Sequence, residues 1–445
     1  MTGRALVIGG SVAGMTAALQ LADLFDEVVV VDRRVLPPPG AVGSVAPHGR
    51  MPHVLLGAGA EALERIAPGF LADLAAYGGV LATEQTHGRW WVAGSHRIAG
   101  PNGVDSAFAT RALLETVVRE RVDARPNVTF RDPMRVRGLR VDRGRVTGVL
   151  SSEGDVDADL VVDASGRHSC APAWLRALGR REPRVSSVWM RLAYTGVTVR
   201  RRPDDLGGVD FVVVQNSADL ARIGVALRGE DTTWQIALGG YFRDTPGTSR
   251  EEIIRFARSL PDTCLADLLD AEWLGEPVPW GFPASVRHHY EGLRDLPPGF
   301  VVIGDAVASF NPIYGQGMSS AVLQAEALKR SVERHGNGSD LPRRVARACA
   351  RIVDNPWRVA TGGDFLYACT VGRKPAGTDL VNRYLEQVFR ACSVDPVVNQ
   401  ALYRVQHLYA PPTSLMRPGM VTRVLRANRH RVPVGTRPHE AALGT

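Results

Sequence analysis

Lysine is almost absent from this chain of 445 residues, because all but two of its 53 basic residues are arginines. The formal net charge is +7. Basic clusters at 135–137, 200–202 and 423–431 lack the interleaved aromatic residues that single-stranded nucleic acids require for stacking. We therefore expect no nucleic-acid partner, although the positive charge would attract an anionic cofactor or substrate.

Cysteine is also scarce, and the five cysteines show neither Cys-x-x-Cys spacing nor a nearby set of histidines. This pattern argues against a disulfide framework and against a tetrahedral metal site, so we expect no metal. Long hydrophobic runs are missing too. The run Ala5–Ile8 is too short for a signal peptide, and no stretch reaches membrane-spanning length. We expect a cytoplasmic protein with no membrane span.

Residues 1–32 carry the pattern of a dinucleotide-binding unit. The apolar strand Arg4–Ile8 leads into Gly9-Gly10-Ser11-Val12-Ala13-Gly14, a helix rich in small residues follows, and a second strand ends at Asp32. In such a unit the glycines allow a tight turn and close approach to a pyrophosphate, while the acid binds a ribose hydroxyl. Ser11 replaces the usual second glycine. The pattern does not distinguish FAD from NAD.

A second unit of strand and glycine-rich turn lies far downstream. The apolar strand 299–303 ends in Gly304-Asp305-Ala306, and the segment Asn311–Met318 precedes a helix that starts near Ser319. This layout again places a glycine-rich turn at a helix N-terminus, where backbone N–H groups favour an anion. The alternative is a simple strand-to-helix corner in which Asp305 caps the turn.

Gly304-Asp305-Ala306, with the proline and glycines that follow, resembles the second FAD motif of the para-hydroxybenzoate-hydroxylase-like flavoprotein monooxygenases. The resemblance implies that Asp305 binds the ribityl chain of FAD and that the turn after it faces the isoalloxazine ring. The segment 163–169, Asp-Ala-Ser-Gly-Arg-His-Ser, is similar to this family's Asp-Gly motif, in the variant form of epoxidases, halogenases and prenyl reductases. Together the three motifs imply one FAD site.

Within that superfamily, the segment 47–56 resembles a Pro-Gln-x-Arg-His-x-His-x-Leu segment of the FAD-dependent epoxidases of polyether-antibiotic biosynthesis. His48 replaces the glutamine and Met51 replaces the first histidine. Arg50 and Arg111 are candidates to bind phosphates or the flavin through paired hydrogen bonds, with surface ion pairs as the alternative. His53 is either a site residue or an interior histidine.

The predicted cofactor-binding set collects the residues of these motifs. It comprises Gly9, Gly10, Ser11, Ala13, Gly14, Asp32, Arg33, Arg50, Arg111, Val136, Asp163, Gly304, Asp305, Pro312, Gly315, Gly317 and Met318.

The β-prone stretches between the Asp163 motif and Gly304 indicate a second sheet, which would roof the flavin and shape a substrate pocket. Strict alternation places Trp189 and Arg191 on one strand face and Gln235 on a face of another strand. With Tyr314, these are the predicted substrate-pocket residues. We expect an α/β fold with three parts: a Rossmann-like FAD-binding domain (1–75, 101–180 and 285–335), an inserted antiparallel-sheet substrate domain (76–100 and 181–284) and a helical C-terminal region (336–445).

These features predict an FAD-dependent monooxygenase. Oxygen that adds to C4a of reduced FAD gives a hydroperoxide, which transfers one oxygen atom by epoxidation or hydroxylation to a largely apolar natural-product intermediate. The protein then needs to position the substrate and exclude water, and no side chain is identified as catalytic. The Trp-x-Trp-x-Ile-Pro run of flavin-dependent halogenases is missing, since Trp90-Trp91 has neither its spacing nor its proline.

Other activities would share the same motifs. A flavin-dependent reductase or dehydrogenase of a prenyl or polyketide substrate is the main alternative, and the intact second motif disfavours a flavin-binding protein without turnover. No second nucleotide-binding fingerprint is visible. We therefore expect NAD(P)H to act as a transient reductant or to deliver electrons through a separate flavin reductase.

Overall fold

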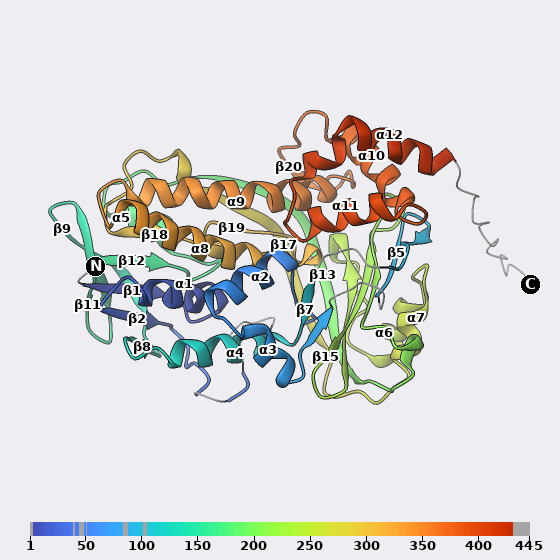
Figure 1. The fold of residues 1–445 in the computed structure, drawn as a ribbon, viewed down its shortest axis with the longest axis horizontal. Helices are drawn as coiled ribbons and strands as arrows, with labels where there is room; N and C mark the ends of the chain where they lie inside the picture. Colours follow the sequence, from blue (N-terminus) through green and yellow to red (C-terminus); the bar gives the residue numbers. More distant parts are fainter. Residues whose placement is uncertain are drawn as a thin grey trace, which may run out of the picture.

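The computed structural model describes residues 3–38, 41–43, 49, 51–82, 88–100 and 105–429. Arg50 and the segment 44–48 lie outside the described residues, so the predictions made for them stay predictions. Two parts lie side by side along the long axis of the molecule (Figure 1). One part combines a parallel sheet with long helices, and the other is built around a large, mostly antiparallel sheet.

A five-stranded parallel sheet, in the order β18-β12-β1-β2-β8, forms the centre of the first part. Its strands are β1 (Arg4–Ile8), β2 (Glu27–Val31), β8 (Val128–Arg131), β12 (Leu160–Asp163) and β18 (Phe300–Val302). The inner strands are apolar and buried along nearly their whole length, as expected for strands that are covered on both faces. Because the strands are parallel, the segments that follow β1, β12 and β18 emerge at the same edge of the sheet.

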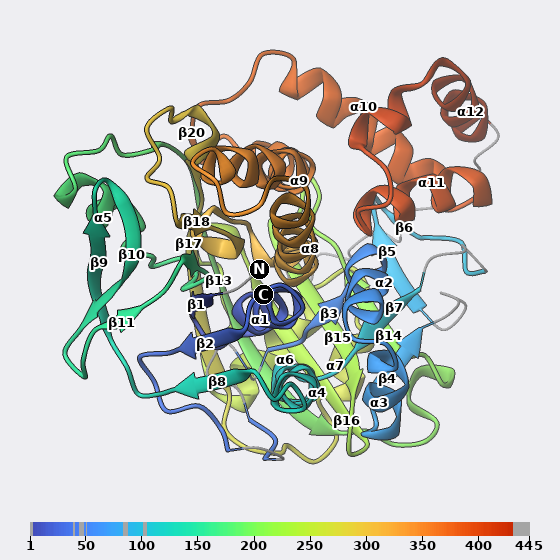
Figure 2. The same ribbon diagram turned by 60° about the vertical axis from the view of Figure 1, so that its left-hand side comes forward.

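Helices and a small antiparallel sheet cover the two faces of this parallel sheet (Figure 2). Helix α1 (Val12–Ala22) packs with α4 (Arg111–Asp123) and α8 (Gly317–His335) on one side. The opposite side carries the antiparallel strands β9 (Val136–Asp142), β10 (Arg145–Ser151) and β11 (Val156–Asp157). The two layers enclose the largest hydrophobic core of the chain.

The second part contains a sheet to which the described residues contribute nine strands. They are β5 (Gly88–Val92), β6 (Ser95–His96), β13 (Arg184–Arg200), β14 (Phe211–Val214), β15 (Arg222–Gly229), β16 (Thr233–Gly240), β17 (Val278–His289), β19 (Ala308–Ser309) and β20 (Val371–Gly372). Helices α6 (Arg250–Arg258) and α7 (Cys264–Leu268) cover one face, packing on a core that includes Val212, Trp234, Ile236 and Leu238.

The other face of the large sheet turns toward the first part. A mixed cluster joins Phe211 and Leu227 of the large sheet to Val80 and Phe108 of a small sheet. That small sheet consists of β3 (Val54–Leu55), β4 (Val80–Ala82) and β7 (Ser106–Phe108). The remaining helices between the N-terminus and the large sheet are α2 (Gly57–Ile66), α3 (Phe70–Ala76) and α5 (Ala171–Ala177).

The C-terminal helices divide into two groups. Helix α9 (Leu341–Asp364) runs along α8 and packs on β18, so it belongs to the first part. Helices α10 (Thr378–Ala391), α11 (Pro396–Gln406) and α12 (Pro418–Arg429) form a separate layer around their own small core (Figure 1). None of the helices in the described part of the chain has the length and hydropathy needed to cross a bilayer.

The observed architecture confirms the predicted fold class of a Rossmann-like α/β domain, a mostly antiparallel second sheet and helices at the C-terminus. The predicted segment boundaries stay predictions, and two elements bear on them. Helix α9, which begins beyond residue 336, packs with the first part. Strand β17 (Val278–His289) continues without interruption through the predicted boundary at 284/285, because it pairs with β13 over almost its whole length. Strand β17 therefore continues across residues 284 and 285 as part of one sheet.

Candidate cofactor site and active site

The first glycine-rich turn leaves no room for side chains. Gly9 has a φ of +113°, and a Cβ there would lie 2.5 Å from the carbonyl oxygen of Ala164. A Cβ on Gly14 would lie only 1.8 Å from the carbonyl oxygen of Gly9. The strand end, the turn and the start of α1 are thus as close as backbone atoms allow, and only glycine meets these conditions at the two positions.

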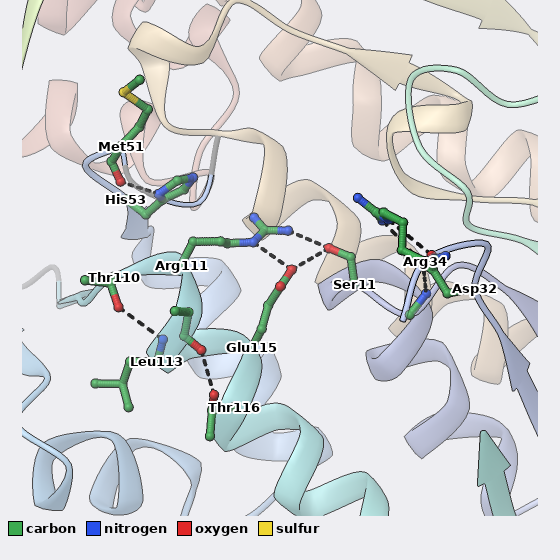
Figure 3. Close-up of polar contacts among 12 residues, drawn as sticks. Ser11, Asp32, Arg34, Met51, His53, Thr110, Arg111, Leu113, Glu115 and Thr116 are labelled. Atoms are coloured by element: carbon green, nitrogen blue, oxygen red, sulfur yellow. Dashed lines mark hydrogen bonds and ion pairs between the residues drawn. The ribbon is translucent and has the colours of Figure 1, made fainter. Parts of the chain in front are cut away.

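The acid at the end of β2 is bound to the same turn. Asp32 is 5% exposed and accepts hydrogen bonds from the backbone N–H of Gly10 at 2.9 Å and from that of Arg34 at 2.9 Å. The Arg34 guanidinium adds an ion pair at 3.2 Å (Figure 3). Arg33, predicted to bind the cofactor, is exposed, and that role stays a prediction. Arg34, which contacts the acid, was not singled out in the sequence.

A buried ionic cluster joins α4 to the glycine-rich turn (Figure 3). The guanidinium of Arg111 donates to the Ser11 hydroxyl at 2.7 Å and to the Glu115 carboxylate at 2.9 Å. The Ser11 hydroxyl in turn donates to Glu115 at 2.6 Å. Arg111 is 8% exposed and Glu115 is 4% exposed, so this pair is shielded from water. Ser11 and Arg111 come together as predicted, whereas sequence reasoning did not single out Glu115.

A side-chain cap fixes the N-terminus of α4, from which Arg111 reaches this turn. The Thr110 hydroxyl caps the helix by accepting from the backbone N–H of Leu113 at 3.1 Å. A small pocket opens between the turn and the helix, with Gly10, Leu36 and Glu115 among its lining residues. The pocket lies beside the first glycine-rich turn, with residues 36–38 and 41–43 on one side and α4 on the other.

The carboxyl group of Asp163 is hydrogen-bonded within its own turn, residues 163–169. It is completely buried and accepts from the backbone N–H of Ser165 at 3.0 Å and from the hydroxyls of Ser165 and Ser169. Burial raises the pKa of Asp163, and the bonds from the two serines oppose that shift. The Asp163 carbonyl accepts from Ile303 at 2.9 Å, which joins this turn to the end of β18. The motif therefore shapes the site through its backbone.

The second glycine motif lies directly against the first. Gly304 has a φ of +68°, and a Cβ there would lie 3.1 Å from the Cβ of Ala13. Next to it, Asp305 has a half-buried carboxyl group to which no group in the described ranges donates a hydrogen bond. Burial raises the pKa of Asp305, and the guanidinium groups of Arg111 and Arg167 act in the opposite direction. Such an unpartnered carboxylate between two arginines is suited to hydroxyl groups of a ligand.

The turn after this motif, residues 311–317, is held against the small sheet. Gly315 has a φ of +65°, and a Cβ there would lie 2.8 Å from a methyl group of Val54. Pro312 is exposed, while Met318 is 9% exposed and belongs to the main core. A Cβ on Gly317 would come no closer than 3.9 Å to the Asp305 carboxylate. Gly317 therefore leaves open space beside Asp305.

The remaining predicted residues differ in where they lie. Val136 begins β9 and packs against the main core. The His53 ring lies 2.6 Å from the carbonyl oxygen of Met51 (Figure 3), so it has a partner within its own segment. Tyr314 is half-buried in the turn 311–317, and burial raises its pKa.

The predicted strict alternation of side chains between the two faces of β13 is wrong. A bulge interrupts its pairing with β17 between Trp189 and Leu192, and Arg191 adopts a φ of +49° there. An inserted residue shifts every later side chain to the opposite face, so Trp189 and Arg191 do not share one regular strand face. Trp189 is 48% exposed and pairs with the short edge strand β20.

The face of the large sheet that meets the cofactor part follows from the pairing register. Gln235, Ala237 and Gly239 lie opposite Thr198, Gly196 and Tyr194 on β13. Opposite residues of an antiparallel pair point to the same side, and this side is the one away from α6 and α7. The cluster on it includes Val54, which also contacts the turn 311–317. Gln235, 4% exposed, therefore lies on the predicted pocket side.

The assembled residues fit FAD. Two glycine-rich turns with little room for a Cβ lie in contact, and the buried Arg111 binds Ser11 of the first turn. In the part of the chain that the structure describes, no group donates a hydrogen bond to the Asp305 carboxylate. Backbone N–H groups and an arginine suit the pyrophosphate, and a free carboxylate suits a polyhydroxyl chain. Within the described residues, no group of histidine, cysteine and acidic side chains could hold a metal ion.

Comparisons with known proteins place the chain beside relatives and solved structures of the same fold. No protein-family model matches the chain. The protein Rv3254 of Mycobacterium tuberculosis is 31% identical over 448 residues, which cover 93% of each chain. Kynurenine 3-monooxygenase of Salinispora arenicola is 27% identical over 354 residues, covering 75% of this chain and 73% of the relative. The crystal structure of p-nitrophenol 4-monooxygenase PnpA from Pseudomonas putida superposes with a TM-score of 0.63 at 17% identity, covering 91% of this chain and 98% of that one.

Proposed function

We propose that this chain, which belongs to the same family as the protein Rv3254 of Mycobacterium tuberculosis, is an FAD-dependent monooxygenase that inserts one oxygen atom into a largely apolar substrate. The shared fold with a solved monooxygenase and the sequence similarity to kynurenine 3-monooxygenase support an oxidoreductase of this kind. The observation that carries the proposal is the contact between the two glycine-rich turns, with the unpartnered Asp305 carboxylate beside them.

The residues of the first part would hold the cofactor. Backbone N–H groups at the start of α1 and the Arg111 guanidinium would bind the pyrophosphate, and Asp305 would accept hydrogen bonds from the ribityl hydroxyls. Glu115 would keep the guanidinium oriented, because its carboxylate accepts hydrogen bonds from both Arg111 and Ser11. Reduced FAD supplies the electrons that activate molecular oxygen.

The large sheet would orient the substrate. Its inward face combines small residues, Gly196, Ala237 and Gly239, with apolar ones such as Val225. This composition suits a mostly apolar molecule, since apolar walls with few polar groups characterise such pockets. Gln235 supplies a polar contact on the same face. The closed fit of this face against the turn 311–317 would exclude water from the reacting centre.

The oxygen transfer is proposed as epoxidation of an alkene or hydroxylation of an electron-rich ring. The similarity of the segment 47–56 to polyether epoxidases supports epoxidation. NAD(P)H, directly or through a separate flavin reductase, is the proposed source of electrons. A flavin-dependent reductase or dehydrogenase would use the same cofactor residues and differs only in its need for oxygen.

The test is oxygen incorporation by the purified holoenzyme. Protein reconstituted with FAD is supplied with NAD(P)H, with or without an added flavin reductase, and with a set of lipophilic alkenes and phenols under ¹⁸O₂. We expect a product heavier by one ¹⁸O atom, detected by mass spectrometry, and no product without oxygen. Product formed equally well under anaerobic conditions would identify a reductase or dehydrogenase. Protein that binds no FAD would refute the proposal as a whole.

A further inference from the structure

A buried carboxyl group ends helix α9 outside the cofactor motifs. Asp364 is completely inaccessible to solvent. One of its oxygens, Oδ1, accepts from the side-chain amide of Asn311 at 2.7 Å and from the Tyr241 hydroxyl at 3.1 Å. The other oxygen, Oδ2, is buried with no hydrogen-bond partner among the described residues. A single carboxyl oxygen thus joins groups from two distant segments of the chain.

The first of these groups controls the turn 311–317. Asn311 is 1% exposed, and its backbone N–H donates to the Ser285 hydroxyl on β17 at 3.0 Å. Its side-chain oxygen accepts from the backbone N–H of Ile313 at 3.2 Å. The amide therefore uses its two ends differently: the oxygen holds the turn, and the nitrogen binds Asp364. A shift of Asp364 would be passed to the turn through one rigid planar group.

The second group belongs to the large sheet. Tyr241 directly follows β16, in the short 3-10 helix Tyr241–Arg243, and is completely buried. Its ring lies 4.6 Å from the Tyr367 ring and packs in a cluster with Met190 and Leu192 of β13. Ile313 of the turn is part of the same cluster. Tyr241 therefore connects the proposed substrate wall to Asp364.

Gly363, next to Asp364, leaves a space that the side chain of Tyr314 occupies. A Cβ on Gly363 would lie 1.9 Å from the Tyr314 hydroxyl oxygen, closer than any non-bonded contact permits. The preceding residue, Gly362, has nothing within 4 Å of its Cβ position. Only one of two adjacent glycines at the end of α9 is thus needed for space, and the space that it leaves holds a residue of the turn 311–317.

We propose that Asp364 and Gly363 are positioning residues that hold the turn 311–317 in register with the substrate sheet, Asp364 through Asn311 and Tyr241 and Gly363 by accommodating Tyr314. The inference rests on the proposed function, in which this turn faces the flavin ring and the sheet faces the substrate. Both residues lie at the end of α9, outside the three cofactor motifs. Their role is to keep the two walls of the reacting space at a constant separation.

The charge state of the cluster agrees with this role. Burial raises the pKa of Asp364 to about 7, while the bonds from Asn311 and Tyr241 lower it. The titratable groups that face the carboxyl group are Tyr241, Tyr314 and Tyr367, and burial raises the pKa of each. The cluster is therefore uncharged below neutral pH, which suits a structural connection in a dry interior.

The test compares four variants of the FAD-loaded full-length chain. Asp364→Ala leaves the buried Tyr241 hydroxyl without its acceptor and removes one of the two acceptors of the Asn311 amide. Gly363→Ala displaces Tyr314. For both variants we expect a changed visible circular dichroism spectrum of the bound flavin and roughly tenfold weaker FAD binding. Asp364→Asn keeps an acceptor at Oδ1, so it should retain the wild-type spectrum. Gly362→Ala is the matched control and should also leave the spectrum unchanged.

A second control separates positioning from loss of stability. Asp205 is another buried carboxyl group; it accepts from the Trp234 indole at 3.0 Å and lies on the side of the large sheet that faces α6 and α7. Asp205→Ala should lower the melting temperature without changing the flavin spectrum. If Asp364→Ala and Gly363→Ala behave in the same way as Asp205→Ala, the inference is wrong. A wild-type protein that binds no FAD would instead refute the proposed function.

Discussion

Ala13, in the first turn of α1, packs against Gly304 at the end of β18, so that a Cβ on the glycine would lie 3.1 Å from the alanine Cβ. Ala13 follows β1, the first strand of the parallel sheet in the sequence, and Gly304 follows β18, the last one. Their contact requires a small residue on both sides. It also places the backbone of the first turn and the Asp305 carboxylate next to one space, which is the geometric basis for a single cofactor site.

The close packing of the first turn predicts a large effect of one methyl group. Gly14→Ala would place a Cβ 1.8 Å from the Gly9 carbonyl oxygen, so α1 must move away from β1. We expect loss of FAD binding and a melting temperature lower by several degrees in thermal unfolding. Gly419→Ala in α12 meets nothing within 4 Å and should be neutral or slightly stabilising. Equal melting temperatures for the two variants would contradict this account of the turn.

The two aspartates of the FAD motifs should respond in opposite ways. Asp305 has no protein partner in the described chain, so Asp305→Ala should weaken FAD binding about tenfold or more and leave the stability of the apoprotein unchanged or higher. Asp163→Ala leaves the hydroxyls of Ser165 and Ser169 unpaired and should destabilise the apoprotein by about 1–3 kcal/mol. Fluorescence titration with FAD and urea unfolding of the apoproteins measure the two effects. A reversed pattern would show that the roles are exchanged.

The ionic cluster on α4 predicts a non-additive pair of mutations. Arg111→Met leaves the Glu115 carboxylate buried without its cation and should cost about 3–5 kcal/mol of stability. Adding Glu115→Gln removes the unpaired charge, so the double variant should recover much of that stability. It should not recover FAD binding, because the guanidinium is gone. A double-mutant cycle by urea unfolding, with FAD titration of each variant, tests both statements.

Asp364 predicts a pH dependence of stability. Its pKa of about 7 in the folded protein exceeds the usual value of 3.8, so between these values the folded state binds a proton that the unfolded state has released. The free energy of unfolding should therefore fall as pH rises from about 4 to about 7, by at most about 4 kcal/mol from this group. Asp364→Asn cannot ionise and should flatten the profile. Identical slopes for wild type and variant in urea unfolding from pH 5 to 8 would rule out this contribution.

The inward face of the large sheet predicts a separation of binding from folding. Ala237 lies on the side of the proposed pocket, whereas Ala226 is completely buried under α6 and α7. Ala237→Phe should raise the KM for substrate by about tenfold or more with little change in FAD binding, because it fills space that the substrate would use. Ala226→Phe overpacks the core and should lower the melting temperature. An unchanged KM for Ala237→Phe would place the substrate elsewhere.

Much of the fold could be predicted from local sequence. The strands 4–8 and 160–163 are short apolar runs flanked by glycines or acids, and their short length and these flanking residues favour a buried parallel strand over a helix. The backbone constraints of the first turn are equally local, because Gly9 and Gly14 are glycines for reasons that involve their immediate neighbours. The extended sheet between 184 and 240 was also visible from its β-prone runs.

Side-chain partners were harder to predict, as three sites show. The ion pair of Arg34 with Asp32 was not indicated, since the direction of a side chain after a strand depends on the turn that follows. The bulge at Arg191 changed which residues share a face, and no sequence signal marked it. Glu115 could have been found, because it lies four residues after Arg111 on a helix, a spacing that favours an ion pair.

The sequence by itself determined that this protein has two glycine-rich turns after buried parallel strands, because those features depend on residues within about one turn of each other. Only the tertiary structure decided that the Asp163 carboxylate is hydrogen-bonded within its own loop, whereas the Asp305 carboxylate accepts no hydrogen bond from the described residues. It also decided that Asp364 and Tyr241 meet the turn 311–317. Contacts between segments more than fifty residues apart depend on how whole sheets and helices pack, and packing leaves no short-range periodicity in the chain.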